Sequence, residues 1–186
     1  MFDMSVKTGT GPVVVEANNC GKSGRVLVLG LGNILLKDEG VGVHVAEELQ
    51  KQDLPGNVEV IDGGTAGMDV LLSQEDSYKL VVVDAVQAGK KPGTVYKARL
   101  KAEEKDRLRE VFSQQKWSKI SLHQVGLLDA LSVAEKMNRA PDEIVIIGVE
   151  PGEVGWGLEL TEPVKQRCPE VIRKVLEEIK DDIHRE

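Results

Sequence analysis

The stretch RVLVLGLGNILLKDEGVGVHVAEELQK, residues 25–51, contains a strand, a loop and a helix in succession. Its opening run, RVLVLGLG, is apolar with little alternation, which is typical of a parallel strand buried on both faces. From Glu39 to Lys51 the apolar residues recur at helical spacing, with Val45, Ala46 and Leu49 on one face. A strand that leads through a short loop into a helix is the unit from which α/β folds are built.

The rest of the chain continues this pattern. Three more apolar runs, NVEVID, KLVVVDAV and EIVIIGVE, begin at residues 57, 79 and 143. Helical periods lie at Gln124–Met137 and Val164–Ile183, and PGTVYKAR, residues 92–99, favours an additional edge strand. Right-handed crossovers between such strands predict an α/β fold: a single three-layer domain, with a mostly parallel twisted sheet and helices on both faces.

The composition favours one acidic domain. With 186 residues, 41% hydrophobic and 30% charged, the chain is long enough for one sizeable core. Residues 1–24 show no helical or alternating period, so we expect a flexible N-terminal arm before a domain over residues 25–186. A net charge of -7 and 3% aromatic residues argue against a nucleic-acid partner.

The sequence does not predict export or membrane insertion. No apolar run reaches the ~18 residues of a membrane helix, and the first residues lack the apolar centre of a signal peptide. Cys20 and Cys168 are far apart and form no CxxC pair, so neither a disulfide framework nor a cysteine zinc site is indicated. We expect a cytoplasmic monomer with no membrane partner.

Acidic residues follow the predicted strands. Asp38 and Glu39 come after the first strand, Asp62 ends the second, Asp84 lies near the end of the third and Glu150 ends the fourth. Because the carboxyl ends of parallel strands share one edge, where ligands bind, we expect these carboxylates around one rim. Each alone could cap a helix or form a turn, and Asp38 could be the N-cap of the first helix. Together, however, like charges are costly unless a cation or a proton is shared among them.

The three histidines have different settings. His44 lies between two valines inside the first helix, which favours a partly buried structural residue. His184 is at the end of the last helix, where the helix dipole favours it. His123, in SLHQVG, lies in a connection just before a helix and is the candidate for function. With Glu39 and Asp84, His123 would offer two oxygens and one nitrogen to a divalent metal, although spacing alone does not show that they meet.

Familiar catalytic and nucleotide motifs do not fit. The GLG at residues 30–32 starts the dinucleotide fingerprint GxGxxG, but the third glycine would fall at Leu35. Glu39 at the helix start would also repel a pyrophosphate. EANNCGKS lacks the first glycine of a P-loop, HVAEE lacks the second histidine of the inverted zincin motif, and neither GxSxG nor HExxH occurs.

The loop after the first strand is therefore better suited to present carboxylates than to hold a phosphate. Gly30 and Gly32 let the chain turn off the strand, and Asn33 helps to hold the loop. Glu39 would then face the rim from the start of a helix.

Five blocks of the sequence resemble a known family: VLGLGNILLKDEGVGV, VIDGGTAGMDVL, VVVDAV, PGTV and SLHQVGLLDAL. In the same order and at similar spacing, they look like the signature blocks of the nickel-iron hydrogenase maturation endopeptidases. The resemblance covers about residues 25–180. It implies an endopeptidase that removes the C-terminal extension of the hydrogenase large-subunit precursor after nickel insertion.

The resemblance also implies site residues. The metal-binding residues of the family carry over onto Glu39, Asp84 and His123. The glycine-rich block is implied to help recognise the substrate and carries over onto Asp62, Gly63, Gly64, Thr65, Ala66 and Gly67. Its small side chains would suit the docking of an extended peptide close to the metal.

Nickel is implied to arrive with the precursor, and we expect no resident organic cofactor. Glu39, Asp84 and His123 would complete the coordination of this nickel, which could polarise the scissile carbonyl or activate water. Alternatively, a carboxylate could act as general base, with Asp38 the nearest candidate in sequence. Two other functions stay open: a non-catalytic module that checks nickel loading and releases the precursor uncut, and a small dinucleotide-binding domain.

Overall fold

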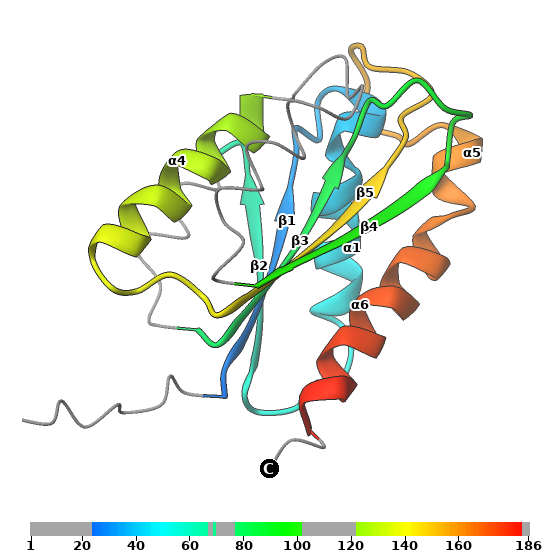
Figure 1. Cartoon of the computed structure of the whole chain (residues 1–186). Coiled ribbons are helices and arrows are strands. Elements are labelled where there is room, and N and C mark those ends of the chain that lie inside the picture. The colour runs from blue at the N-terminus through cyan, green and yellow to red at the C-terminus, as the bar shows by residue number, and fades with distance from the viewer. Residues whose placement is uncertain (1–23, 67–68, 70–76, 102–121, 184–186) are drawn as a thin grey trace, which may run out of the picture.

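One five-stranded sheet forms the centre of the molecule, with the strand order β2-β1-β3-β5-β4 (Figure 1). The computed structural model describes residues 24–66, 69, 77–101 and 122–183, with the backbone alone for 122–126, 128 and 181–183. The predicted N-terminal arm up to residue 23 and His184 lie outside these residues. The strands are β1 (Val26–Leu31), β2 (Val58–Gly64), β3 (Lys79–Ala85), β4 (Val95–Lys101) and β5 (Glu143–Val149).

The predicted sheet is confirmed. β1 pairs in parallel with β2 and β3, and β3 pairs in parallel with β5. β4, the additional strand expected from PGTVYKAR, pairs antiparallel with β5 and forms one edge of the sheet. The residues of β1, β3 and β5 are buried along their whole length, as expected of strands covered on both faces.

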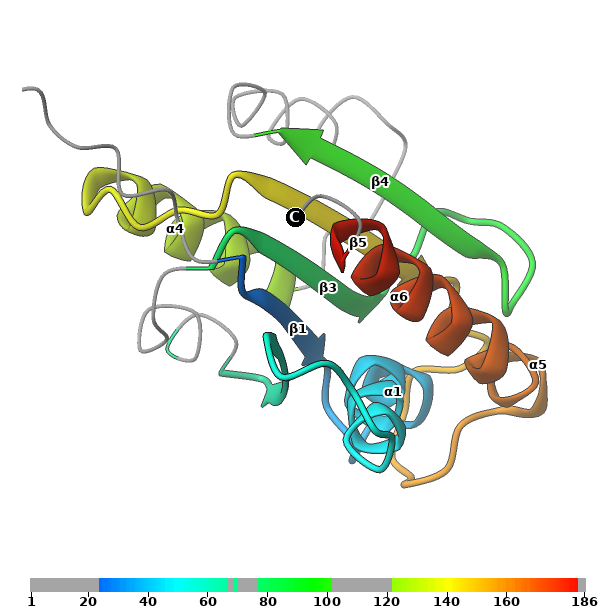
Figure 2. The ribbon, with the colours of Figure 1, turned by 90° about the horizontal axis from the view of Figure 1, so that it is seen from below.

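Helices cover both faces of this sheet, as the sequence predicts (Figure 2). One apolar cluster joins α1 (Val41–Leu49) and α6 (Cys168–Ile183) to alternate residues of the central strands, such as Val81 and Val83. A second cluster joins α4 (Leu122–Lys136) to the intervening residues, such as Leu80 and Val82. The three layers follow from the two-residue period of a strand, because each central strand contributes to both cores.

The predicted continuous helix from Val164 to Ile183 is divided in two, which corrects the sequence interpretation. A short helix, α5 (Glu162–Lys165), ends before α6 begins at Cys168. Pro169 contributes to the break, because proline has no N–H to donate to the carbonyl of Lys165. The apolar period continues across the break, so both pieces still pack on the same core.

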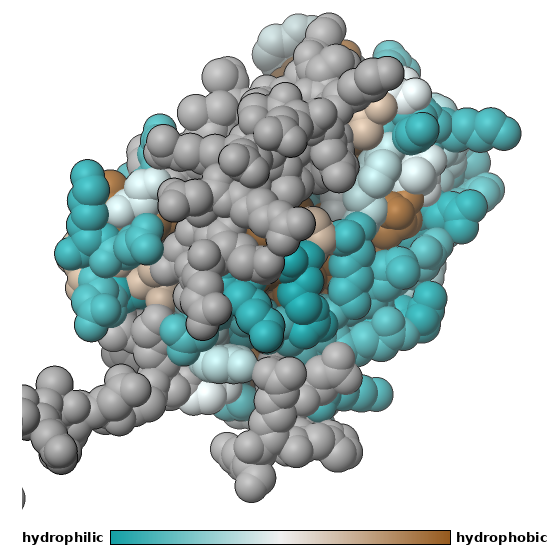
Figure 3. Space-filling view, in the orientation of Figure 1, coloured by the Kyte–Doolittle hydropathy of each residue, from teal (hydrophilic) through white to brown (hydrophobic). Residues whose placement is uncertain are grey.

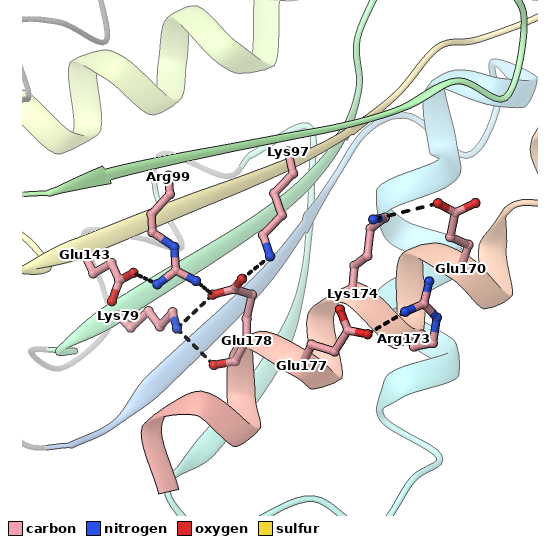
Figure 4. A network of polar contacts seen from close by, with 9 residues as sticks. All are labelled: Lys79, Lys97, Arg99, Glu143, Glu170, Arg173, Lys174, Glu177 and Glu178. Carbon is pink, nitrogen blue, oxygen red and sulfur yellow. Dashed lines mark hydrogen bonds and ion pairs between the residues drawn. The ribbon is translucent and has the colours of Figure 1, made fainter. Parts of the chain in front are cut away.

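A group of charged side chains ties α6 to the sheet (Figure 4). Glu178 on α6 is fully buried, and the equally buried Lys79 Nζ lies 3.0 Å from its carboxylate and donates to its backbone carbonyl at 2.9 Å. Arg99 of β4 lies 2.5 Å from the same carboxylate and also contacts Glu143, while Lys97 contacts Glu178 from the strand edge. The surface over β4 and α6 is correspondingly hydrophilic (Figure 3).

No helix in the described part of the chain has the length and apolarity needed to cross a bilayer.

Candidate active site

The loop after β1 turns sharply through two glycines. Gly32 has a φ of +136°, and a Cβ there would lie 1.9 Å from the carbonyl oxygen of Glu39. Gly30 lets α1 approach the sheet, since a Cβ there would lie 2.2 Å from the carbonyl oxygen of Gly42. The Asn33 side chain accepts a hydrogen bond from the Leu35 N–H at 3.0 Å, which holds the loop as predicted. These residues therefore fix where the following acids lie.

Asp38 anchors a second loop to this one. Its fully buried carboxylate accepts hydrogen bonds from the backbone N–H groups of Gly152 at 2.7 Å, Glu153 at 2.9 Å and Thr161 at 2.6 Å. The Thr161 hydroxyl donates a fourth bond at 2.7 Å. Neither η1 (Lys37–Gly40) nor α1 receives a side-chain cap, so the N-cap interpretation of Asp38 is wrong. With four donors, the carboxylate is better suited to positioning the loop than to acting as a general base.

Glu39 lies beside this anchor, in η1, at the entry to α1. Its residue is half-buried, between the fully buried Asp38 and the buried Gly40. The short helix contacts β3 across the carboxyl edge of the sheet. Glu39 therefore belongs to a segment that packs next to the strand carrying Asp84.

Asp84 lies at the carboxyl end of β3 and is buried. Its carboxylate accepts a hydrogen bond from the Ala85 N–H at 2.8 Å. Strand alternation places it on the same face as Leu80 and Val82, which is the face that α4 covers. Since α4 begins at the carboxyl edge, the backbone of His123 and the side chain of Asp84 are brought to the same face of the sheet (Figure 1).

His123 is in the first turn of α4, not in the connection before it as expected. Its side chain is not among those that the structure describes. Within the described side chains, no three His, Cys, Asp or Glu residues lie close enough to hold a metal ion. The metal set of Glu39, Asp84 and His123 therefore stays a prediction, supported by the arrangement of η1, β3 and α4.

Asp62 and the glycine-rich block form the neighbouring part of the rim. Asp62 is exposed in β2, where it pairs with Gly30, and accepts a hydrogen bond from the Gly64 N–H at 2.8 Å. The Gly64 carbonyl accepts a bond from the Gly32 N–H at 2.9 Å, so this block is tied to the β1 loop. Thr65 and Ala66 are exposed, and Gly67 lies outside the described residues. The four acids Asp38, Glu39, Asp62 and Asp84 thus follow parallel strands to one edge.

The fifth rim carboxylate, Glu150, has structural partners. It is buried after β5 and accepts hydrogen bonds from the Ala88 N–H at 2.9 Å, the Gly89 N–H at 3.0 Å and the Tyr96 hydroxyl. Burial, the hydrogen bond from Tyr96 to Glu150 and the negative charge of Glu150 raise the pKa of Tyr96. A pocket of about 180 Å³ opens beside these contacts and is lined by Gln87, Gly89, Glu150, Pro151, Gly152, Glu153 and Val154.

His44 and Cys168 have structural contacts and are not candidates for catalysis. His44 is partly buried in α1, with Nδ1 3.8 Å from the Glu47 carboxylate, as predicted for a packing residue. The Cys168 thiol donates to the Val164 carbonyl at 3.7 Å, and burial raises its pKa, which disfavours the thiolate that a nucleophile needs. Neither residue is part of the proposed reaction.

Sequence reasoning missed the loop over residues 150–161. Apart from Glu150, this segment shows no apolar period and no motif of known chemistry, so the sequence predicts no role for it. In the structure it lies against the β1 loop, and Leu36 and Gly157 form a parallel bridge between the two. The run of small and apolar residues in PGEVGWGLEL was the available signal.

Comparisons with known proteins agree with this geometry. The hydrogenase maturation protease family matches residues 43–178. The hydrogenase expression/formation protein HupD of Bradyrhizobium diazoefficiens is 39% identical over 145 residues, which are 77% of this chain and 71% of that protein. The structure of the hydrogenase maturating endopeptidase HybD from Escherichia coli is similar, with a TM-score of 0.72, 34% identity and coverage of 84% of this chain and 93% of that one.

A more distant structure has the same fold. The [NiFe] hydrogenase maturation protease HybD from Thermococcus kodakarensis matches with a TM-score of 0.64 and 28% identity, over 82% of this chain and 97% of that one. The match to the family over most of the domain and the identity to HupD together establish the relationship. This chain belongs to the hydrogenase maturation proteases, a family of endopeptidases.

Proposed function

We propose that this protein removes the C-terminal extension of the nickel-iron hydrogenase large-subunit precursor after nickel has been inserted. Membership of the maturation protease family supports the reaction class, and the name of the Thermococcus relative includes the nickel-iron enzyme. The observation that carries the proposal is that η1 contacts β3 at the carboxyl edge of the sheet, where α4 also begins (Figure 1). These three elements carry Glu39, Asp84 and His123.

In this proposal nickel is part of the substrate. Two carboxylates and one imidazole leave coordination positions open, which the precursor's own ligands would fill. Holding the nickel would fix the scissile bond beside it, and positioning of this kind contributes strongly to catalysis. The metal would then polarise the carbonyl or activate water. Because Asp38 already accepts four hydrogen bonds, we assign it to positioning Glu39 and the 150–161 loop.

The block from Asp62 to Ala66, in which Asp62, Thr65 and Ala66 are exposed and Gly63 is buried, would receive the extended C-terminal segment of the precursor. The strand β2 is an edge strand, and an edge offers unpaired backbone groups to an extended peptide. At Gly64, the nearest atom to an added Cβ lies 3.7 Å away, so the backbone there is open on this side. The remaining residue of the block, Gly67, keeps its predicted role.

Neither alternative function is favoured. The matched family consists of proteases, which argues against a module that only checks nickel and releases the precursor uncut. A dinucleotide-binding domain would need the pyrophosphate at the start of α1, where the half-buried Glu39 lies instead.

The experiment uses cells that produce the hydrogenase and one variant of the protease. Glu39→Ala, Asp84→Ala and His123→Ala should each leave uncut precursor, seen as the slower band of the large subunit on a gel. His44→Ala is the matched control, because it removes a histidine from α1 without removing a ligand, and it should process the precursor normally.

Circular dichroism of each purified variant checks that it is folded. A parallel reaction with nickel-free precursor should show no cleavage by the wild-type enzyme. Normal processing by the three ligand variants, or equal cleavage of nickel-free precursor, would contradict the proposal.

A further inference from the structure

Large apolar side chains are exposed at one place on the carboxyl edge. They form what we call the rim patch, which consists of Ile34 (40% exposed), Leu35 (48%), Val154 (43%), Trp156 (84%) and Leu158 (62%). The other large hydrophobic residues exposed in the described part of the chain are Val133, in the last turns of α4, and Met137, directly after its end. Grouped exposure of this kind marks interaction sites more often than scattered exposure does.

The patch is held rigidly by two loops. Lys37 N–H donates to the Gly157 carbonyl at 2.9 Å, and Gly157 N–H donates to the Leu35 carbonyl at 3.0 Å. This parallel bridge brings Leu35 beside Trp156. An ion pair of 2.6 Å between Lys37 and Glu153 and the four bonds to Asp38 fix the loop further. The apolar side chains are thus held towards solvent by a network that keeps them from folding inward.

The position of the patch indicates its occupant. The loop that carries Ile34 and Leu35 runs directly into Asp38 and Glu39, so the patch borders the segment that carries Glu39. A protein substrate whose cleaved segment reaches Glu39 must cover the surface around it. Rigid exposed tryptophan at the centre of such a surface is typical of residues that dominate protein–protein affinity.

The negative charge near the patch indicates which side chains the partner would carry. Glu159, which follows Leu158, and Glu162, at the start of α5, are both exposed. Glu162 accepts a hydrogen bond from the uncharged Gln166 side chain at 2.9 Å. A complementary surface would carry apolar side chains flanked by lysine or arginine.

We infer that the rim patch docks the body of the precursor, through apolar side chains bordered by basic ones, while the active site holds its nickel. The inference rests on the proposed function, because it takes the precursor as the partner. It adds a determinant of substrate affinity that is separate from the metal ligands. Loss of the patch should therefore raise KM, whereas loss of a ligand should lower kcat.

The test compares three double variants with the wild type, using the purified nickel-loaded large-subunit precursor. Trp156→Ala with Leu158→Ala should raise KM for processing about tenfold or more, with kcat within about twofold. Val133→Ala with Met137→Ala is the matched control, because it removes exposed apolar side chains at the C-terminal end of α4 instead. It should leave both constants unchanged. Glu159→Lys with Glu162→Lys should raise KM several-fold.

A binding measurement separates failure of the docking surface from failure of the proposed function. Glu39→Ala should leave the precursor uncut even at saturating precursor, whereas the Trp156/Leu158 variant should bind more weakly than the wild type and still cut at saturation. If the wild type does not cut nickel-loaded precursor, the proposed function fails, and the Kd comparison still tests the patch. An unchanged Kd and KM in the Trp156/Leu158 variant would overturn the inference. So would a wild-type dimer that this variant converts to a monomer, since the patch would then bind a second copy.

Discussion

At the scale of single residues, two neighbours in sequence have different tasks. Asp38 is buried and satisfied by four hydrogen bonds, while Glu39 remains half-exposed at the rim. The difference arises because Gly32 allows a turn in which Asp38 faces the 150–161 loop. A buried carboxylate is stable only with such partners, so Asp38 organises the surface from which Glu39 acts.

Replacing Asp38 should cost stability. Asp38→Ala leaves three backbone N–H groups and one hydroxyl without their acceptor, and we expect a loss of about 3 kcal/mol in the free energy of unfolding. Urea denaturation followed by circular dichroism measures the change. Asp62→Ala is the control, because Asp62 is exposed, and its cost should stay below about 1 kcal/mol. Equal losses in the two variants would contradict the anchoring role.

At the scale of elements, buried charge fixes α6 on the sheet. Burial acts to raise the pKa of Glu178, but hydrogen bonds and charge from Lys97, Lys79 and Arg99 outweigh it and lower the pKa to about 2. The depressed pKa means that the ionised carboxylate stabilises the folded state. This contribution is fully present above the unfolded pKa, near 4.5, and is lost as the pH falls towards 2.

Glu178→Gln should therefore have a pH-dependent effect. At pH 7 the variant leaves the buried Lys79 without its charged partner, at a cost of about 3–5 kcal/mol. The gap in unfolding free energy between wild type and variant should narrow as the pH is lowered from 4.5 towards 2, because the wild type then loses its own charge. Urea titrations at several pH values measure this gap. Glu177→Gln, which removes an exposed partner of Arg173 on the same helix, should show a small gap at every pH.

At the scale of the whole molecule, the proposed metal site exists only after three distant segments have come together. η1, β3 and α4 follow one another along the chain, yet η1 contacts β3 at the carboxyl edge of the sheet, and α4 begins at the same edge (Figure 1). The unfolded chain does not hold Glu39, Asp84 and His123 in one place. Binding of a metal ion to all three is therefore coupled to folding.

A divalent ion should accordingly stabilise the free enzyme. Zinc at about 100 times its Kd should raise the free energy of unfolding by about 2.7 kcal/mol, through preferential binding to the folded state. His123→Ala should bind the ion more weakly and gain less, whereas His44→Ala should gain as much as the wild type. Thermal melts with and without zinc, together with calorimetry, measure both effects. An unchanged Kd in His123→Ala would remove that residue from the site.

The sequence by itself determined the fold class and the edge of the sheet at which the acids gather. Unbroken apolar runs such as KLVVVDAV predict strands buried on both faces, and parallel strands bring the acids that follow them to one edge. Both conclusions rest on local patterns, because the period of a strand or a helix is set by residues close together in the chain. The resemblance to the maturation endopeptidases implied which of those acids would bind the metal. The family itself is confirmed.

Only the tertiary structure decided which carboxylates are committed to structural partners. The hydrogen bonds of Asp38 join residues 114 to 123 positions apart, and the ion pair of Lys79 with Glu178 spans 99. The apolar periodicity of the sequence does not predict such partners, because they depend on how loops and helices pack after the sheet has formed. The same holds for the rim patch, where Leu35 and Trp156 are brought together by a backbone bridge that neither segment specifies alone.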